Sequence, residues 1–245
     1  MAAYFRNPAG ASGMLPSVEQ TAAYYRERRM LAVIFPVDTE RETGQARITN
    51  EEVAEDAARH PDVWVQSHVA ENLDEVKWAA ELFPDARSYL GVYGDHGLLR
   101  ERAVYAHCIH LDADDRALMR ETGAAAAVSP TSNLFLGSGF FDFAAADAAG
   151  MRYGLASDVG GGTSFSPFHT MLAAYYVGRE GQSKTGLSLT PGQLWWQHTA
   201  GAAQALGLTG VVGNLQPGNE ADFVVLNPQA TPLLARKTAQ ANSLD

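Results

Sequence analysis

The chain of 245 residues is 46% hydrophobic and 19% charged, which is typical of a soluble globular protein with one large domain. Its formal net charge of −10, without a run of Lys or Arg, argues against nucleic acid or an anionic membrane as a partner and favours a small substrate. The single cysteine, Cys108, excludes an intrachain disulfide. The N-terminus is not signal-like and no apolar run is long enough to span a bilayer, so we expect a cytoplasmic protein.

From about residue 57 to 206, short apolar runs alternate with helix-forming segments. The run at residues 63–65 leads to His68, and a helix with a broad apolar face is predicted over residues 71–83. The run at residues 103–106 leads to His107, and the next helix is predicted over residues 112–122. Gly123 stands where a helix commonly ends.

The alternation continues with a third short strand at residues 124–128, a loop at residues 130–139 and a helix at residues 141–149 that Gly150 ends. A fourth strand, at residues 153–157, leads to Asp158. The spacings of 39 residues from His68 to His107 and of 51 from His107 to Asp158 suit repeated strand–helix units.

The C-terminal part of the sequence predicts one long helix and one strand. Thr190 and Gln193 have the spacing of a capping box, Pro191 suits the first helical position, and the helix is expected to run to about Leu206. A turn and a strand are predicted within residues 213–226. A single strand cannot bury its own face, so this one requires partner strands in a small β domain.

Polar side chains stand at the ends of three of the predicted strands, and such ends gather at one mouth of a parallel (β/α)8 barrel. Two histidines and an aspartate in this order suggest a metal-assisted hydrolase. A Rossmann-like sheet is the alternative, but no Gly-x-Gly-x-x-Gly follows an early strand, and Gly160 to Gly162 are better explained as room for a ligand or loop.

Each of these residues also has a simpler interpretation. A histidine at a strand end is more often a hydrogen-bonded structural residue than a ligand, and an aspartate before glycines is common in turns. By the same reasoning His110 is expected to support the loop after His107. Trp195 and Trp196 are expected to pack in the core or between domains.

Three stretches of sequence carry a resemblance to a known family. They are Gln66-Ser-His-Val-Ala-Glu-Asn72, Pro130-Thr-Ser-Asn-Leu-Phe-Leu-Gly-Ser-Gly-Phe-Phe-Asp142 and Gly154-Leu-Ala-Ser-Asp-Val-Gly-Gly-Gly-Thr-Ser-Phe-Ser166. Over residues 57–238 the chain resembles guanine deaminases of the amidohydrolase superfamily. The His-x-x-Glu and Ser-Asp elements are shared by the deaminase and chlorohydrolase branch, whereas the Leu-Phe-Leu-Gly-Ser-Gly-Phe-Phe and Asp-Val-Gly-Gly-Gly-Thr-Ser-Phe-Ser runs point more narrowly to guanine.

The resemblance implies an α/β fold, a distorted (β/α)8 TIM barrel with a small β-sandwich, and the zinc-dependent conversion of guanine to xanthine and ammonia. It implies that His68 and Asp158 bind Zn²⁺, with Fe²⁺ as the alternative metal. Glu71 would be the proton shuttle, and His107 would bond the attacking water or the developing charge. His68, Glu71 and Asn133 would contact the purine, although Asn133 could equally pack beneath the barrel mouth. The family also implies a homodimer.

The sequence departs from the family pattern before residue 57. Family members begin the barrel with a His-x-His pair on the first strand, and here no histidine precedes His60. Arg47 is a weak stand-in for the base-binding arginine of a Pro-Arg-Phe element. A complete barrel takes about 250 residues. We therefore expect an incomplete barrel with a poorly matched segment at residues 1–56, the later barrel strands at residues 57–208 and part of a β-sandwich at residues 209–245.

Three functional hypotheses remain open from the sequence. The first is guanine deamination, active when the missing strands are supplied. The second is a related amidohydrolase acting on another aminated or halogenated heterocycle. The third is a catalytically inert remnant. Because His68, Asp158 and His107 make at most three metal ligands, this chain is expected to retain zinc weakly.

Overall fold

The structure is a computed structural model, and it describes residues 18–28, 40, 44, 46, 48–180 and 187–242. The chain divides into two compact units, residues 1–59 and 60–245. The described part of the first unit contains the helices α1 (Val18–Glu27) and α3 (Asn50–Arg59). No helix within the described ranges is long and apolar enough to cross a membrane.

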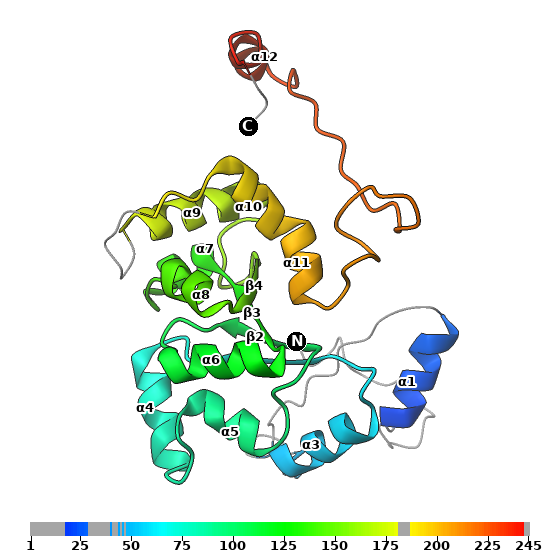
Figure 1. The fold of residues 1–245 in the computed structure, drawn as a ribbon, viewed down its shortest axis with the longest axis vertical. Coiled ribbons are helices and arrows are strands. Elements are labelled where there is room, and N and C mark those ends of the chain that lie inside the picture. Colours follow the sequence, from blue (N-terminus) through cyan, green and yellow to red (C-terminus); the bar gives the residue numbers. More distant parts are fainter. Residues whose placement is uncertain are drawn as a thin grey trace. The chain divides into compact units, whose positions relative to one another are not determined.

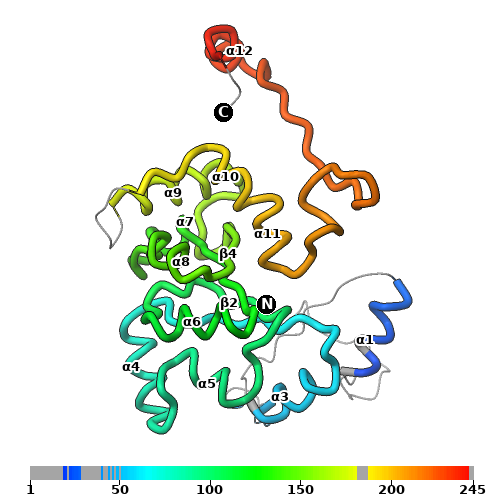
Figure 2. Tube along the Cα trace, viewed as in Figure 1, coloured from blue at the N-terminus to red at the C-terminus, as the bar shows by residue number. Residues whose placement is uncertain are grey.

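The second unit is built on a four-stranded parallel sheet in the order β1-β2-β3-β4 (Figure 1). The strands are β1 (Val65–Val69), β2 (Ala103–His107), β3 (Ala125–Val128) and β4 (Arg152–Leu155). Each strand pairs with the next along the chain, a path that Figure 2 traces from cyan to yellow-green. All four predicted strands are confirmed within a few residues. The α/β arrangement with a parallel sheet is consistent with part of a TIM barrel.

Helices connect the strands, as parallel pairing requires. The connections contain α4 (Leu73–Leu82) and α5 (Tyr89–Asp95), then α6 (Ala113–Thr122), then α7 (Pro130–Leu136) and α8 (Phe143–Ala149). After β4 come α9 (Pro167–Glu180), α10 (Pro191–His198), α11 (Ala200–Ala205) and α12 (Pro232–Thr238). Both α10 and α11 pack against β4, and α7 packs against α9.

Caps fix the boundaries of two predicted helices; the end at Gly123 and the box at Thr190 are confirmed, and the box at Asp112 is an addition. Asp112 and Asp115 form a capping box at the start of α6, and Gly123 ends this helix in the left-handed conformation, with φ 76°. Thr190 and Gln193 form the capping box of α10, with proline at the first helical position. These side chains satisfy backbone groups that the first and last turns of a helix leave without partners.

Two predictions of secondary structure are wrong in part. Residues 130–136, expected as a loop, form α7. The long helix expected after Thr190 is broken at Thr199, whose backbone (φ −126°, ψ −99°) is not helical. Directly after this break Gly201 lies against Trp196, where a Cβ atom would come within 2.7 Å of the indole ring. The close approach fixes the bend between α10 and α11.

The strand predicted within residues 213–226 is not formed. Residues 221–227 are neither helix nor strand, and Phe223, Val224 and Val225 are exposed. In the described ranges no other strand pairs with this segment, so its backbone gains no ladder of hydrogen bonds. The small β-sandwich is thus not confirmed.

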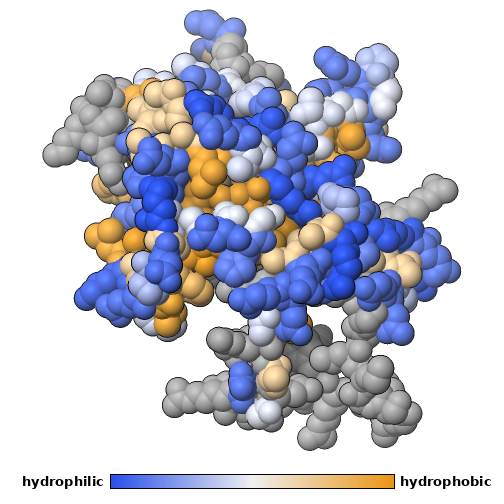
Figure 3. All heavy atoms as spheres, turned by 60° about the horizontal axis from the view of Figure 1, so that its bottom comes forward, coloured by the Kyte–Doolittle hydropathy of each residue, from blue (hydrophilic) through white to orange (hydrophobic). Residues whose placement is uncertain are grey.

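The core of the second unit lies on and around the sheet. Val69, Tyr105, Val128 and Met119 are almost wholly buried. The apolar face predicted for α4 does not join this core: of the residues of α4, only Ala79 is buried. Figure 3 shows a face of the molecule where hydrophobic surface lies open between hydrophilic regions.

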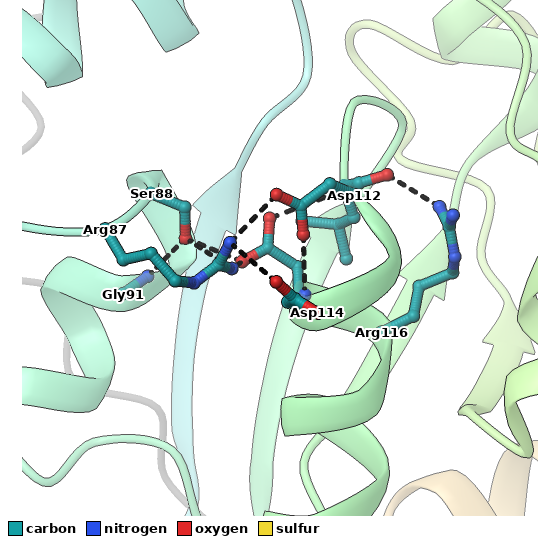
Figure 4. Close-up of polar contacts among 8 residues, drawn as sticks. Arg87, Ser88, Gly91, Asp112, Asp114 and Arg116 are labelled. Carbon is teal, nitrogen blue, oxygen red and sulfur yellow. Dashed lines mark hydrogen bonds and ion pairs between the residues drawn. The ribbon is translucent and has the colours of Figure 1, made fainter.

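A polar cluster joins the N-termini of α5 and α6 (Figure 4). Arg87 contacts Asp112 at 2.9 Å and also contacts Asp115, whose carboxylate accepts a hydrogen bond of 2.6 Å from Ser88. The hydrogen bond from Arg87 lowers the pKa of Asp112. Burial raises the pKa of Asp115. Ser88 also caps α5, so one cluster fixes the starts of two helices.

We predict that Gly154→Ala destabilises the second unit by about 1–3 kcal/mol, because extra volume in a packed interior forces neighbours apart. A Cβ atom at Gly154 in β4 would lie 3.0 Å from Ala202 Cα in α11. Gly192→Ala in α10 is the matched control, since a Cβ atom there meets nothing within 4 Å. Urea unfolding should separate the two variants, and equal stabilities would contradict the close packing of β4 on α11.

Candidate functional site

The residues that follow the strands share an unusual backbone conformation. Ala70 after β1, His107 and Cys108 at the end of β2, and Asp158 after β4 all have positive φ, at 50°, 69°, 52° and 48°. Non-glycine residues adopt this region rarely and at a cost, and such strain often concentrates at functional sites. The chain therefore turns sharply at three strand ends that lie at one edge of the sheet.

His107 is the centre of the polar contacts at this edge. Its imidazole is buried, and its Nδ1 lies 2.8 Å from Asn133 Oδ1. Because an amide oxygen only accepts, Nδ1 carries the proton in this arrangement. Nε2 lies 3.6 Å from Glu71 Oε2 and 3.9 Å from Asp158 Oδ2. One ring thus faces both carboxylates that the sequence analysis singled out.

His68 and Glu71 come from β1 and the turn that follows it. The His68 ring lies beside the His107 ring, with centroids 5.3 Å apart, but the His68 side chain is exposed. Glu71 Oε1 accepts a hydrogen bond of 2.9 Å from Ser138 Oγ, and the Glu71 backbone N–H donates to Glu75 at 3.0 Å. The structure therefore brings His68, Glu71 and His107 together.

Asn133 lies in α7 and is buried. Its Oδ1 faces His107, whereas its Nδ2 is buried without a hydrogen-bond partner in the described part of the chain. The hydroxyl of the neighbouring Ser132 is likewise buried without a hydrogen-bond partner among the described residues. The contact with His107 favours a role for Asn133 beneath the site. The Asn133 amide and the Ser132 hydroxyl could still donate hydrogen bonds to a bound molecule.

Asp158 stands at the start of the glycine-rich turn. Gly161 lies so close that a Cβ atom would come within 3.1 Å of Asp158 Oδ2 and 2.6 Å of Ser132 Oγ, and Gly162 packs against the backbone of Ser157. Glycine is needed at these two positions because the backbone passes too close to Ser132, Ser157 and Asp158 to leave room for a Cβ atom. This close packing explains the glycines without a phosphate-binding loop.

Of the remaining candidates, Arg47 lies outside the described residues. His110, on the turn after β2, supports the loop that follows α7, because its Nε2 lies 3.0 Å from the Ser138 carbonyl oxygen. Sequence reasoning gave Ser138 no role of its own. The only signal for it was its place between two glycines in the Leu-Phe-Leu-Gly-Ser-Gly run.

The match to known families agrees with this geometry. The model of the amidohydrolase family matches residues 38–243, which is most of the chain. The chain belongs to the amidohydrolase family. Members of this family are metal-dependent.

The amidohydrolase is similar to guanine deaminase of Escherichia coli, with 41% identity over 174 residues, 71% of this chain and 39% of that protein. The solved structure of an E. coli guanine deaminase matches with a TM-score of 0.75 and 38% identity over 80% of this chain and 45% of that one. A guanine deaminase from C. acetobutylicum with bound guanine matches at 25% identity and a TM-score of 0.62, covering 68% and 41% of the two chains. The chain spans about two fifths of the length of such curated relatives.

The donors at the site fit a metal in type but only partly in arrangement. Imidazole nitrogen and carboxylate oxygen are common zinc ligands. However, no group of three or more His, Cys, Asp or Glu side chains is placed to hold a metal ion in the ranges that the structure describes. That His68 and Asp158 bind a metal therefore stays a prediction.

We predict that Asn133→Leu destabilises the amidohydrolase by about 1–3 kcal/mol, because it leaves the buried Nδ1–H of His107 without an acceptor. In a His107→Phe background the same substitution should cost much less. Chemical denaturation of the four variants gives the coupling between the two side chains. Equal costs in both backgrounds would contradict the hydrogen bond.

Proposed function

We propose that this amidohydrolase acts in the hydrolysis of guanine to xanthine and ammonia. The observation that carries the proposal is the convergence of Glu71, His107 and Asp158 at the strand ends, with both carboxylates within 4 Å of one imidazole nitrogen. The guanine deaminases to which the chain is similar support guanine as the substrate. The small acidic chain without a run of Lys or Arg is consistent with a small-molecule substrate.

Glu71 is proposed to carry the proton. Hydrolysis adds water to C2 of guanine and breaks the bond to the amino nitrogen. One proton of the water must therefore move to a ring nitrogen and the other to the amino nitrogen, which leaves as ammonia. Glu71 Oε1 is held by Ser138, and Oε2 is the oxygen nearer His107. A carboxylate in this position accepts the proton of the attacking water and delivers it to the ring nitrogen.

His107 and Asp158 are proposed to hold the attacking water. Nε2 of His107 is the free ring nitrogen, because Nδ1 bonds Asn133. It would accept a hydrogen bond from a water that lies between the two carboxylates. Asn133 fixes the orientation of the ring and reaches the purine only indirectly.

Zinc is the proposed cofactor, with His68 and Asp158 among its ligands. When bound, the metal supplies an activated water at neutral pH. An adenosine deaminase from Xanthomonas campestris with bound zinc shares the fold at 18% identity and a TM-score of 0.67.

The first experiment measures ammonia release from guanine and zinc content for the purified 245-residue chain. Where ammonia is released, we expect it from guanine in preference to adenine, cytosine and triazine analogues, and we expect the purified chain to hold less than one zinc per chain. Glu71→Gln should lower kcat by about 10²–10⁴-fold, the usual contribution of a general acid–base group.

Glu81→Gln, on the exposed surface of α4, is the matched control and should retain full activity. Turnover of another heterocycle in place of guanine would move the substrate assignment within the family. Full activity of Glu71→Gln would overturn its role in proton transfer.

A further inference from the structure

We propose that Ser138 is a positioning residue that orients Glu71 for proton transfer. The inference rests on the proposed function, since Glu71 has a catalytic role only if the site carries out hydrolysis. It gives a purpose to the Leu-Phe-Leu-Gly-Ser-Gly run, to which the proposed mechanism assigns no step.

The contact between the two side chains is direct and partly buried. Ser138 Oγ donates to Glu71 Oε1 at 2.9 Å across 67 positions of sequence, and Ser138 is buried. A hydroxyl has one hydrogen to donate, so this bond commits the Ser138 proton to one oxygen of Glu71. The other oxygen, Oε2, is left toward Nε2 of His107 at 3.6 Å.

This division between the two oxygens has a chemical consequence. An oxygen that accepts a hydrogen bond is a weaker proton acceptor than one that does not. The proton therefore belongs on Oε2, which faces His107 and the space beside Asp158. Ser138 thereby selects the oxygen that takes and gives the proton.

The backbone of Ser138 is held on both sides. Its N–H donates to the Asn133 carbonyl at 2.9 Å, and its carbonyl accepts from Nε2 of His110 at 3.0 Å. Because Asn133 also holds His107, α7 and the turn after it fix both proton-handling side chains. A serine supported in this way loses little freedom when it bonds Glu71.

The glycines on either side make the turn possible. Gly137 ends α7 with φ 73°, and Gly139 has φ 134°, a region that residues with a Cβ atom rarely enter. A Cβ atom at Gly139 would also lie 3.1 Å from Ile109. The two glycines let the chain reverse within three residues and aim the Ser138 hydroxyl inward.

The first test is structural and does not depend on activity. Crystal structures of the 245-residue chain are determined for the wild type and for Ser138→Ala and Ser138→Thr. We expect the Glu71 carboxylate to move away from His107 in the alanine variant and to keep its place in the threonine variant. A Glu71 carboxylate that stays in place in Ser138→Ala would overturn the proposal.

The second test is kinetic. Ser138→Ala should lower kcat on guanine by roughly 10–100-fold with a smaller change in KM, because a misplaced proton carrier slows the chemical step more than binding. Ser138→Thr, which keeps the hydroxyl, should restore most of kcat. Unchanged kcat in Ser138→Ala, or equal losses in both variants, would contradict positioning by the hydroxyl.

Ser88→Ala is the matched control, since Ser88 Oγ also donates to a carboxylate, that of Asp115, in the cluster drawn in Figure 4. It should lower stability but leave kcat unchanged, which separates positioning from a general loss of folding. If the wild-type chain releases no ammonia from guanine, the proposed function fails for this chain. The crystal structures then still decide whether Ser138 positions Glu71.

Discussion

The parallel register of four strands is the constraint on which the candidate site depends. Val69 at the end of β1 pairs with His107 at the end of β2, and the same parallel pairing continues to Val128 and Leu155 in β3 and β4. Parallel strands finish at the same edge, so residues far apart in sequence meet there. The turns with positive φ that follow three of the strands then direct side chains inward instead of continuing the sheet.

The candidate site gathers two carboxylates around one histidine ring. With Nδ1 of His107 facing Asn133, its Nε2 faces the carboxylates of Glu71 and Asp158. Two carboxylates gathered around one ring nitrogen repel each other unless a proton or a cation lies between them. The proposed hydrolysis would place a mobile proton and a metal in this same small space, and the family is metal-dependent.

The sequence predicted the elements that carry regular signals. Alternating strands and helices, the cap at Thr190 and the ends at Gly123 and Gly150 were all recognisable, because caps and glycines act through local backbone chemistry. α7 was missed because its apolar residues are consecutive, although Pro130 at the first helical position was a usable signal.

Hydrogen bonds between side chains far apart in the sequence could not be predicted from such local signals. Asn133 could be singled out, but its bond to His107 joins residues 26 positions apart, which no local signal relates. Ser138 lies 67 positions from Glu71, and no periodicity relates them.

The exposure of His68 limits what the described strands achieve alone. Among the described residues β1 pairs with β2 only, and Gln66 and His68 on one face of β1 are exposed while His107 on β2 is buried. Hydrolytic sites gain much of their strength by excluding water, which strengthens each electrostatic contact inside. Among the described residues no strand pairs with the other edge of β1, and a strand added there would pair with its backbone groups and flank His68. A partner at this edge would therefore extend the sheet and shield the candidate site at the same time.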